Sequence, residues 1–113
     1  MYTVIRKYDL IPGTIEEFIQ HVQKGLVPII NRVPGFREYS LVEVGDNEVV
    51  AISIFDSLAD AKASARQIAV WVAEHTELFF QGFSKPMAGK VRVLSGPASW
   101  SLTRGEELLQ GVF

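Results

Sequence analysis

The sequence predicts an α+β domain in which two helices cover one face of a small antiparallel sheet and a second copy of the chain covers the other. Two neighbouring runs, residues 41–44 and 49–55, predict strands with apolar side chains on both faces. Such strands need a cover on each face. Only two segments have convincing helical periodicity, which is enough for one face. We therefore expect a homodimer through the sheet faces.

Composition sets the broad class of protein. The chain has 113 residues, which is one domain, and its 48% hydrophobic and 21% charged residues are ordinary for a globular protein. A net charge of −2 with scattered lysines and arginines argues against nucleic acid. The lack of cysteine excludes disulfides and thiolate catalysis. Because no signal-peptide pattern or membrane-length apolar run is present, we expect a cytoplasmic protein and no membrane partner.

The first half of the predicted domain is a strand followed by a helix. Residues 2–8 alternate as a strand, and residues 11–13 form a turn. Thr14 and Glu17 have the spacing of a capping box, so the helix should start there. Pro28 should kink or divide this helix, because proline lacks the amide that would bond back to Lys24. The apolar stripe of the helix is Ile15, Phe18, Ile19, Val22, Leu26, Ile29 and Ile30.

A hairpin, a second helix and a last strand complete the pattern. Residues 36–44 and 48–55 predict two strands joined by a turn at residues 45–47. Ser57 and Asp60 repeat the capping spacing and begin a helix that runs to about Leu78. Its buried stripe is Leu58, Ala61, Ala65, Ile68, Val72 and Phe79. Residues 80–88 are expected to form a loop and residues 89–95 the fourth strand.

The resulting order is β-α-β-β-α-β, which is the split βαβ arrangement of the ferredoxin-like fold. We expect this domain to span residues 1–96. Residues 97–113 are too apolar for a free tail and too short for a domain. They are therefore predicted to be a C-terminal extension that packs on the domain or on the partner subunit.

The chain resembles the antibiotic biosynthesis monooxygenase superfamily of dimeric α/β-barrel proteins. The resemblance rests on Val-Pro-Gly-Phe at residues 33–36, Ile-Phe-Asp-Ser at residues 54–57 and the alanine-rich helix around residues 61–65. It implies two sheets that face each other across a dimer. The superfamily includes oxygenases of aromatic polyketides and quinols that need no metal or flavin, haem-degrading enzymes and isomerases. Of the three residues typical of the haem-degrading branch, only a histidine, His75, has a counterpart here, which argues against haem degradation.

The candidate site residues are a histidine and its aromatic neighbours. His75, near the end of the second helix, is the best general acid or base, although a helix-capping role is the more common one for such a histidine. Trp71 lies one turn earlier and could wall an aromatic pocket with it or serve as core. Tyr8 and Tyr39 could orient a substrate or form a cross-strand pair. Arg37 could stabilise an anion or pair with a carboxylate at the sheet edge.

Other chemistry is not indicated. Two histidines on different helices and scattered carboxylates predict no metal site, and no glycine-rich phosphate loop is present, so no cofactor is expected. His21 lies off the apolar stripe and is expected to be solvated. Phe79, Phe80 and Phe83 are expected to form dimer contacts.

Three functions are compatible with these residues. The preferred one, implied by the resemblance, is a cofactor-independent monooxygenase that acts on an aromatic or quinol-like small molecule. The alternative is a non-enzymatic dimeric protein that binds a small apolar or aromatic ligand or serves as an accessory protein. A small isomerase or decarboxylase of the same fold is the third.

Overall fold

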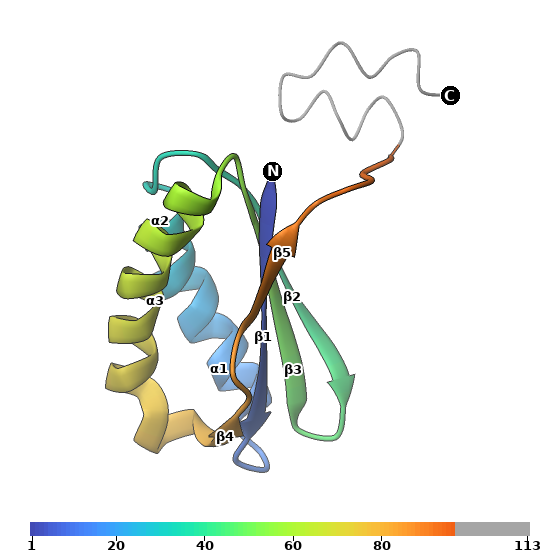
Figure 1. The fold of residues 1–113 in the computed structure, drawn as a ribbon. Helices are drawn as coiled ribbons and strands as arrows, with labels where there is room; N and C mark the ends of the chain where they lie inside the picture. The colour runs from blue at the N-terminus through green and yellow to red at the C-terminus, as the bar shows by residue number, and fades with distance from the viewer. Residues whose placement is uncertain (97–113) are drawn as a thin grey trace.

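The chain folds as one antiparallel sheet with its helices on a single face, in a computed structural model that describes residues 1–96 (Figure 1). All five strands belong to one sheet. The elements, in chain order, are β1 (Tyr2–Leu10), α1 (Ile15–His21), the π-helix η1 (Val22–Leu26), α2 (Val27–Ile30), β2 (Phe36–Gly45), β3 (Glu48–Phe55), α3 (Leu58–Phe79), β4 (Phe80–Phe83) and β5 (Met87–Lys90).

The sheet has the strand order of the ferredoxin-like fold. β1 and β3 are central, β2 lies outside β3, and β4 and β5 both pair with the other side of β1. Every pairing is antiparallel. The predicted α+β ferredoxin-like fold is therefore confirmed.

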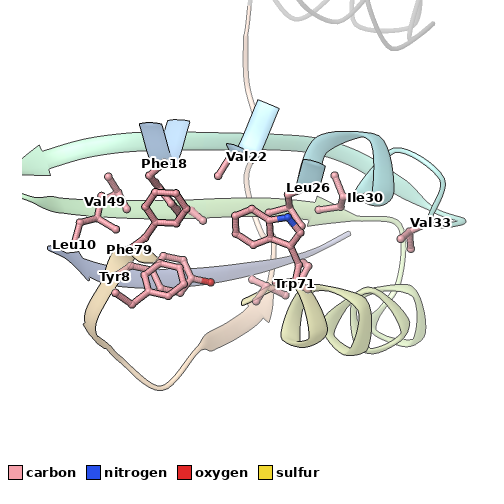
Figure 2. Close-up of a cluster of buried hydrophobic side chains, with 14 of the residues drawn as sticks. Tyr8, Leu10, Phe18, Val22, Leu26, Ile30, Val33, Val49, Trp71 and Phe79 are labelled. Carbon is pink, nitrogen blue, oxygen red and sulfur yellow. The ribbon is translucent and has the colours of Figure 1, made fainter. Parts of the chain in front are cut away.

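The helix-facing side of the sheet forms the core. Along β3, Val49, Ala51, Ser53 and Phe55 are buried in strict alternation, because successive side chains of a strand point to opposite faces. Phe18 of α1 packs on this layer with 1% of its surface exposed. Its ring lies 5.5 Å, between centroids, from those of Phe79 and Phe80. Figure 2 shows Phe18, Phe79 and Trp71 between the helices and the strands.

The opposite face of the sheet is apolar as well. Val50, Ile52 and Ile54 alternate with the buried residues of β3, and Ile5 of β1 lies directly across from Ile52. These four side chains are only partly buried, and the helices of residues 1–96 all lie on the other side of the sheet (Figure 1). The open face therefore has the composition expected of a surface that a second layer covers.

The first helical segment is divided, as Pro28 predicts. In η1 the amide of Val27 bonds to the carbonyl of Val22, five residues back, and α2 then begins with Pro28 in its first turn. Proline is tolerated there because the first helical amides have no partner within the helix. The predicted capping box at Thr14 is wrong, since its hydroxyl donates to the carbonyl of Ile11, at 2.6 Å, and makes no cap bond.

The start of α3 is capped as predicted. The Ser57 hydroxyl accepts from the amide of Asp60 and donates to its carboxylate, at 3.1 and 2.9 Å. Gly35, just before β2, packs against the same carboxylate in a left-handed conformation, with φ of +77°. A β-carbon at this position would collide with the carboxylate of Asp60, so any residue other than glycine would have to displace it.

The last part of the sheet differs from the prediction. Residues 80–83, expected to be loop, form β4, and the fourth strand occurs at Met87–Lys90 rather than at residues 89–95. Phe79 and Phe80, predicted to be dimer contacts, are instead core residues with 1% and 7% exposure. The predicted extension, residues 97–113, lies outside the described residues. Within residues 1–96, no helix is long and apolar enough to cross a membrane.

Candidate functional site

A small pocket lies between β1 and α3, and we call it the β1–α3 pocket. Its volume is about 270 Å³. The strand contributes two polar side chains, α3 contributes an apolar wall, and the segment between β4 and β5 closes one side. The lining residues are Arg6, Tyr8, Ala65, Ile68, Ala69, Val72, Ser84 and Pro86. Small side chains at Ala65 and Ala69, one turn apart on α3, leave the space that larger residues would fill.

A β-bulge shapes the side of this pocket formed by residues 84–86. Ser84 bonds to the carbonyl of Lys7, and Met87 pairs with Ile5, so Lys85 and Pro86 together stand opposite the single residue Arg6. Proline brings no amide to the ladder, and an extra residue bends the strand. The extra residue therefore lies beside Arg6, where Ser84 and Pro86 line the pocket.

Two tyrosines on the helix-facing side of the sheet remain protonated at neutral pH. Tyr8 is 6% exposed and stacks on Phe80, with 4.9 Å between ring centroids. Burial raises the pKa of Tyr8, and the nearby charge of Arg6 opposes that shift. Burial also raises the pKa of Tyr39, with a further contribution from Tyr8 and again an opposing one from Arg6. Both groups are thus neutral hydroxyls within the electrostatic reach of one guanidinium.

A second hollow lies between the helices, and we call it the helix groove. Its volume is about 520 Å³, and it is lined by Glu17, Gln20, His21, Lys24, Gly25, Ile29, Trp71 and His75. Gly25, in the π-helix, lets the indole approach, since a β-carbon there would lie 3.0 Å from Trp71 Nε1. The surface of η1 at Gly25 is therefore shaped to accept the Trp71 indole.

The helix groove brings together the two residues that were predicted to act as a pair. Trp71 and His75 stack with 4.0 Å between ring centroids and 18° between ring planes. The Nδ1 of His75 donates to the carbonyl of Trp71 at 2.8 Å, which leaves Nε2 as the nitrogen available to a ligand. Trp71 is 5% exposed, so the core role considered for it is confirmed.

His21 also joins this aromatic group, while its side chain keeps 39% of its surface exposed, in line with the expectation of a solvated residue. Its ring lies 5.5 Å from that of His75 and 5.0 Å from that of Phe79, and the residue is partly buried. Sequence periodicity missed this contact because it depends on how α1 packs against α3. Among residues 1–96, no group of three or more histidine, cysteine or acidic side chains could hold a metal ion.

The remaining predicted site residues lie elsewhere. Tyr39 lines a third hollow, between β2 and the first helical segment, of about 400 Å³. Arg37 forms an ion pair with Asp56 at the sheet edge and lines none of the three hollows described above. The five predicted residues are therefore spread over four places. Arg6 was missed, although the alternation of the first strand puts it on the same face as Tyr8.

The chain belongs to the antibiotic biosynthesis monooxygenase family, whose sequence profile matches residues 1–69. A comparison with curated proteins finds no match. The family assignment agrees with the strand order and with the position of the helices on one face of the sheet.

Solved structures with the same fold include proteins with and without a described activity. A protein of unknown function from Nitrosomonas europaea shares 19% identity at a TM-score of 0.66, over 84% of this chain and 90% of that one. A putative antibiotic biosynthesis monooxygenase from Chloroflexus aurantiacus shares 19% identity at a TM-score of 0.65, over 84% of this chain and 96% of that one. SnoaB, a cofactor-independent oxygenase from Streptomyces nogalater, shares 17% identity at a TM-score of 0.65, over 82% of this chain and 94% of that one. At these identities the likeness shows the fold alone.

Proposed function

We propose that the protein is a cofactor-independent monooxygenase that acts on an aromatic or quinol-like small molecule in the β1–α3 pocket. Membership of the family and the description of SnoaB as a cofactor-independent oxygenase support this class of reaction. The observation that carries the proposal is the lining of the pocket: a neutral tyrosine hydroxyl and a guanidinium stand among apolar side chains. Small-molecule sites commonly combine an apolar wall with a few polar groups.

This arrangement suits a reaction in which the substrate supplies the electrons. An activated methylene or phenol ionises, and its carbanion or phenolate reduces O₂. One oxygen atom becomes a carbonyl of the product and the other leaves as water, with all four electrons taken from the substrate. Arg6 would stabilise the anion, Tyr8 would donate a hydrogen bond to its oxygen, and the apolar wall would limit water.

The predicted catalytic role of His75 would place the same reaction at a second candidate site, the helix groove. His75 does not line the β1–α3 pocket, so it can act as a general base only on a substrate in the helix groove. There its free Nε2 and the stacked Trp71 would meet an aromatic ring. The two sites predict different sets of inactive variants.

A cytoplasmic homodimer also belongs to this proposal. The apolar open face formed by Ile5, Val50, Ile52 and Ile54 supports pairing of two sheets, which would cover the face opposite the helices. Light scattering at micromolar concentration should give the mass of two chains, and a mass of one chain would remove the dimer from the proposal.

Oxygen consumption tests the function. The purified protein is assayed with hydroquinones of one and two rings, beside Tyr8→Phe, Arg6→Gln and His75→Gln. We expect turnover that falls in the Tyr8 and Arg6 variants. Loss of turnover only in His75→Gln would move the reaction to the helix groove. No oxygen uptake with any substrate would reject the oxygenase and favour the ligand-binding alternative.

A further inference from the structure

We infer that the β1–α3 pocket takes a small aromatic acid, bound as an anion whose charged oxygen, a carboxylate or a phenolate, is the counterion of Arg6. The inference rests on the proposed function for the place of the site, and it adds the chemical class of ligand. It depends on three features: the position of Arg6, its lack of an acidic partner and the neutrality of the tyrosines nearby.

Arg6 is held on the buried side of the sheet by the pairing of β1. It lies across from Ala51 of β3, whose side chain is buried against the helices, and it alternates with Lys7 on the opposite face. Because directly paired residues share a face, the Arg6 side chain must run on the helix side. The residue is partly buried, and it lines the β1–α3 pocket.

Within residues 1–96, Arg6 forms no ion pair and no side-chain hydrogen bond. Two other basic residues of the sheet do have acidic partners. Lys7 pairs with Glu48 at 3.3 Å, and Arg37 pairs with Asp56. None of the residues that line the β1–α3 pocket is acidic. A guanidinium that lines a pocket without an acidic neighbour can pair with an anionic group of a ligand.

The tyrosines cannot supply the missing charge. Both Tyr8 and Tyr39 are close enough for the charge of Arg6 to act on them, yet burial raises the pKa of each above its usual value. They are therefore neutral at physiological pH and can only donate or accept hydrogen bonds. Since no acidic group of residues 1–96 lies beside Arg6, a bound anion would supply the negative charge, and Tyr8 lines the same pocket and could donate to that ligand.

The pocket limits the size of that molecule. Its volume of about 270 Å³ lies just below the usual range of ligand pockets, which begins at roughly 300 Å³. Its wall of Ala65, Ile68, Ala69 and Val72 is apolar and suits a flat ring. We therefore expect a compact aromatic acid of one or two rings, with the acidic group directed to β1.

Matched probes test the charge without any turnover. Benzoate is compared with benzamide, and para-nitrophenol, above and below its ionisation, with para-nitroanisole, by calorimetry in the absence of oxygen. We expect at least one of the two acids to bind the wild-type protein about 10- to 100-fold more tightly as the anion than its neutral counterpart, the range of one charge-assisted hydrogen bond. A preference for benzoate would indicate a carboxylate ligand, and a preference for the para-nitrophenol anion would indicate a phenolate.

Variants of Arg6 locate the effect. Arg6→Met should remove the preference for the anion, and Arg6→Lys should retain part of it. Arg32→Gln, at an exposed arginine that lines none of the three hollows described above, removes the same charge elsewhere and should bind as the wild type does. Circular dichroism checks that each variant is folded. If Arg6→Met does not fold, Arg6→Lys is used to test the preference for the anion.

The outcomes separate this inference from the proposed function. Equal binding of the charged and neutral probes, no binding of either acid at millimolar concentration, or a preference that survives in Arg6→Met would each overturn the inference. Anion-selective binding without oxygen uptake on any substrate would keep it and reject the monooxygenase. Oxygen uptake with a neutral substrate and no preference for anions would keep the monooxygenase and reject the inference.

Discussion

Gly35→Ala is expected to be among the most destabilising single-methyl additions in the domain. Gly35 has φ of +77°, a region where a side chain costs about 1–2 kcal/mol. The new β-carbon would stand 2.0 Å from Oδ2 and 2.4 Å from Cγ of Asp60, so that carboxylate must move. Moving it breaks the bond from the Ser57 hydroxyl, worth about 0.5–1.5 kcal/mol, and withdraws a charge from the start of α3, worth about 0.3–1 kcal/mol.

The sum is a loss of about 1.8–4.5 kcal/mol in the free energy of unfolding, or about 7–18 °C in Tm at roughly 4 °C per kcal/mol. Gly13→Ala is the matched control. Gly13 has φ of +86° but has no atom within 4 Å of the added β-carbon. It should therefore lose only the backbone term of about 1–2 kcal/mol.

Urea unfolding at one fixed protein concentration measures both variants, because a dimer makes stability depend on concentration. A double-mutant cycle with Asp60→Ala tests the clash with the carboxylate: in that background the excess cost of Gly35→Ala over Gly13→Ala should shrink to the small part that comes from the β-carbon of residue 60, 3.0 Å from the added one. Equal losses for Gly35→Ala and Gly13→Ala in the wild-type background would refute the role given to the Asp60 carboxylate.

Four further predictions concern the cap, the core, the alkaline limit and the open face. Ser57→Ala removes the cap of α3 and should cost about 1 kcal/mol in urea unfolding. Phe18→Ala should cost about 3–5 kcal/mol in the same assay, because the ring is 1% exposed and contacts three other aromatic rings. The raised pKa of Tyr39 means that above pH 10 the unfolded chain loses its phenolic proton before the folded one does. Stability should therefore fall as pH rises beyond 10, by up to about 1.4 kcal/mol per pH unit for this group, and Tyr39→Phe should fall less steeply in pH-dependent unfolding. Ile52→Glu places a charge in the middle of the open face and should give one-chain mass in light scattering with an unchanged circular dichroism spectrum; a two-chain mass would place any dimer contact elsewhere.

The element order could be predicted because each segment has a clear period. The stripe around Phe18 repeats every three or four residues, and β3 alternates at every second one. Local chemistry was harder to predict: Thr14 has the spacing of a capping residue, yet its hydroxyl turns back to Ile11. The fourth strand was misplaced because Pro86 has the appearance of a loop residue, whereas here it sits in a bulge between two short strands.

The candidate site could be predicted only where its residues share one element. Trp71 and His75 are four residues apart, so a helix must stack them on one face. His21 joins them only through the packing of α1 against α3, which no single-helix pattern contains. Arg6 could have been recognised from the alternation with Val4 and Tyr8, but its lack of an acidic partner became visible only with the other strands in place.

The bulge beside the β1–α3 pocket also bears on how the protein avoids aggregation. An exposed sheet edge is a template on which a strand from another molecule can add, and long uninterrupted edges are the most dangerous. β4 and β5 have four residues each and are separated by the bulge and Pro86, so this side of the sheet has no long run of regularly spaced backbone groups. β2, at the other edge, spans ten residues with register shifts only near its two ends, so its middle is a longer regular run, and it exposes Val42 and Val44. Intermolecular strand addition should therefore begin at β2, and a proline or lysine placed in that strand should suppress it more than any change in β4 or β5.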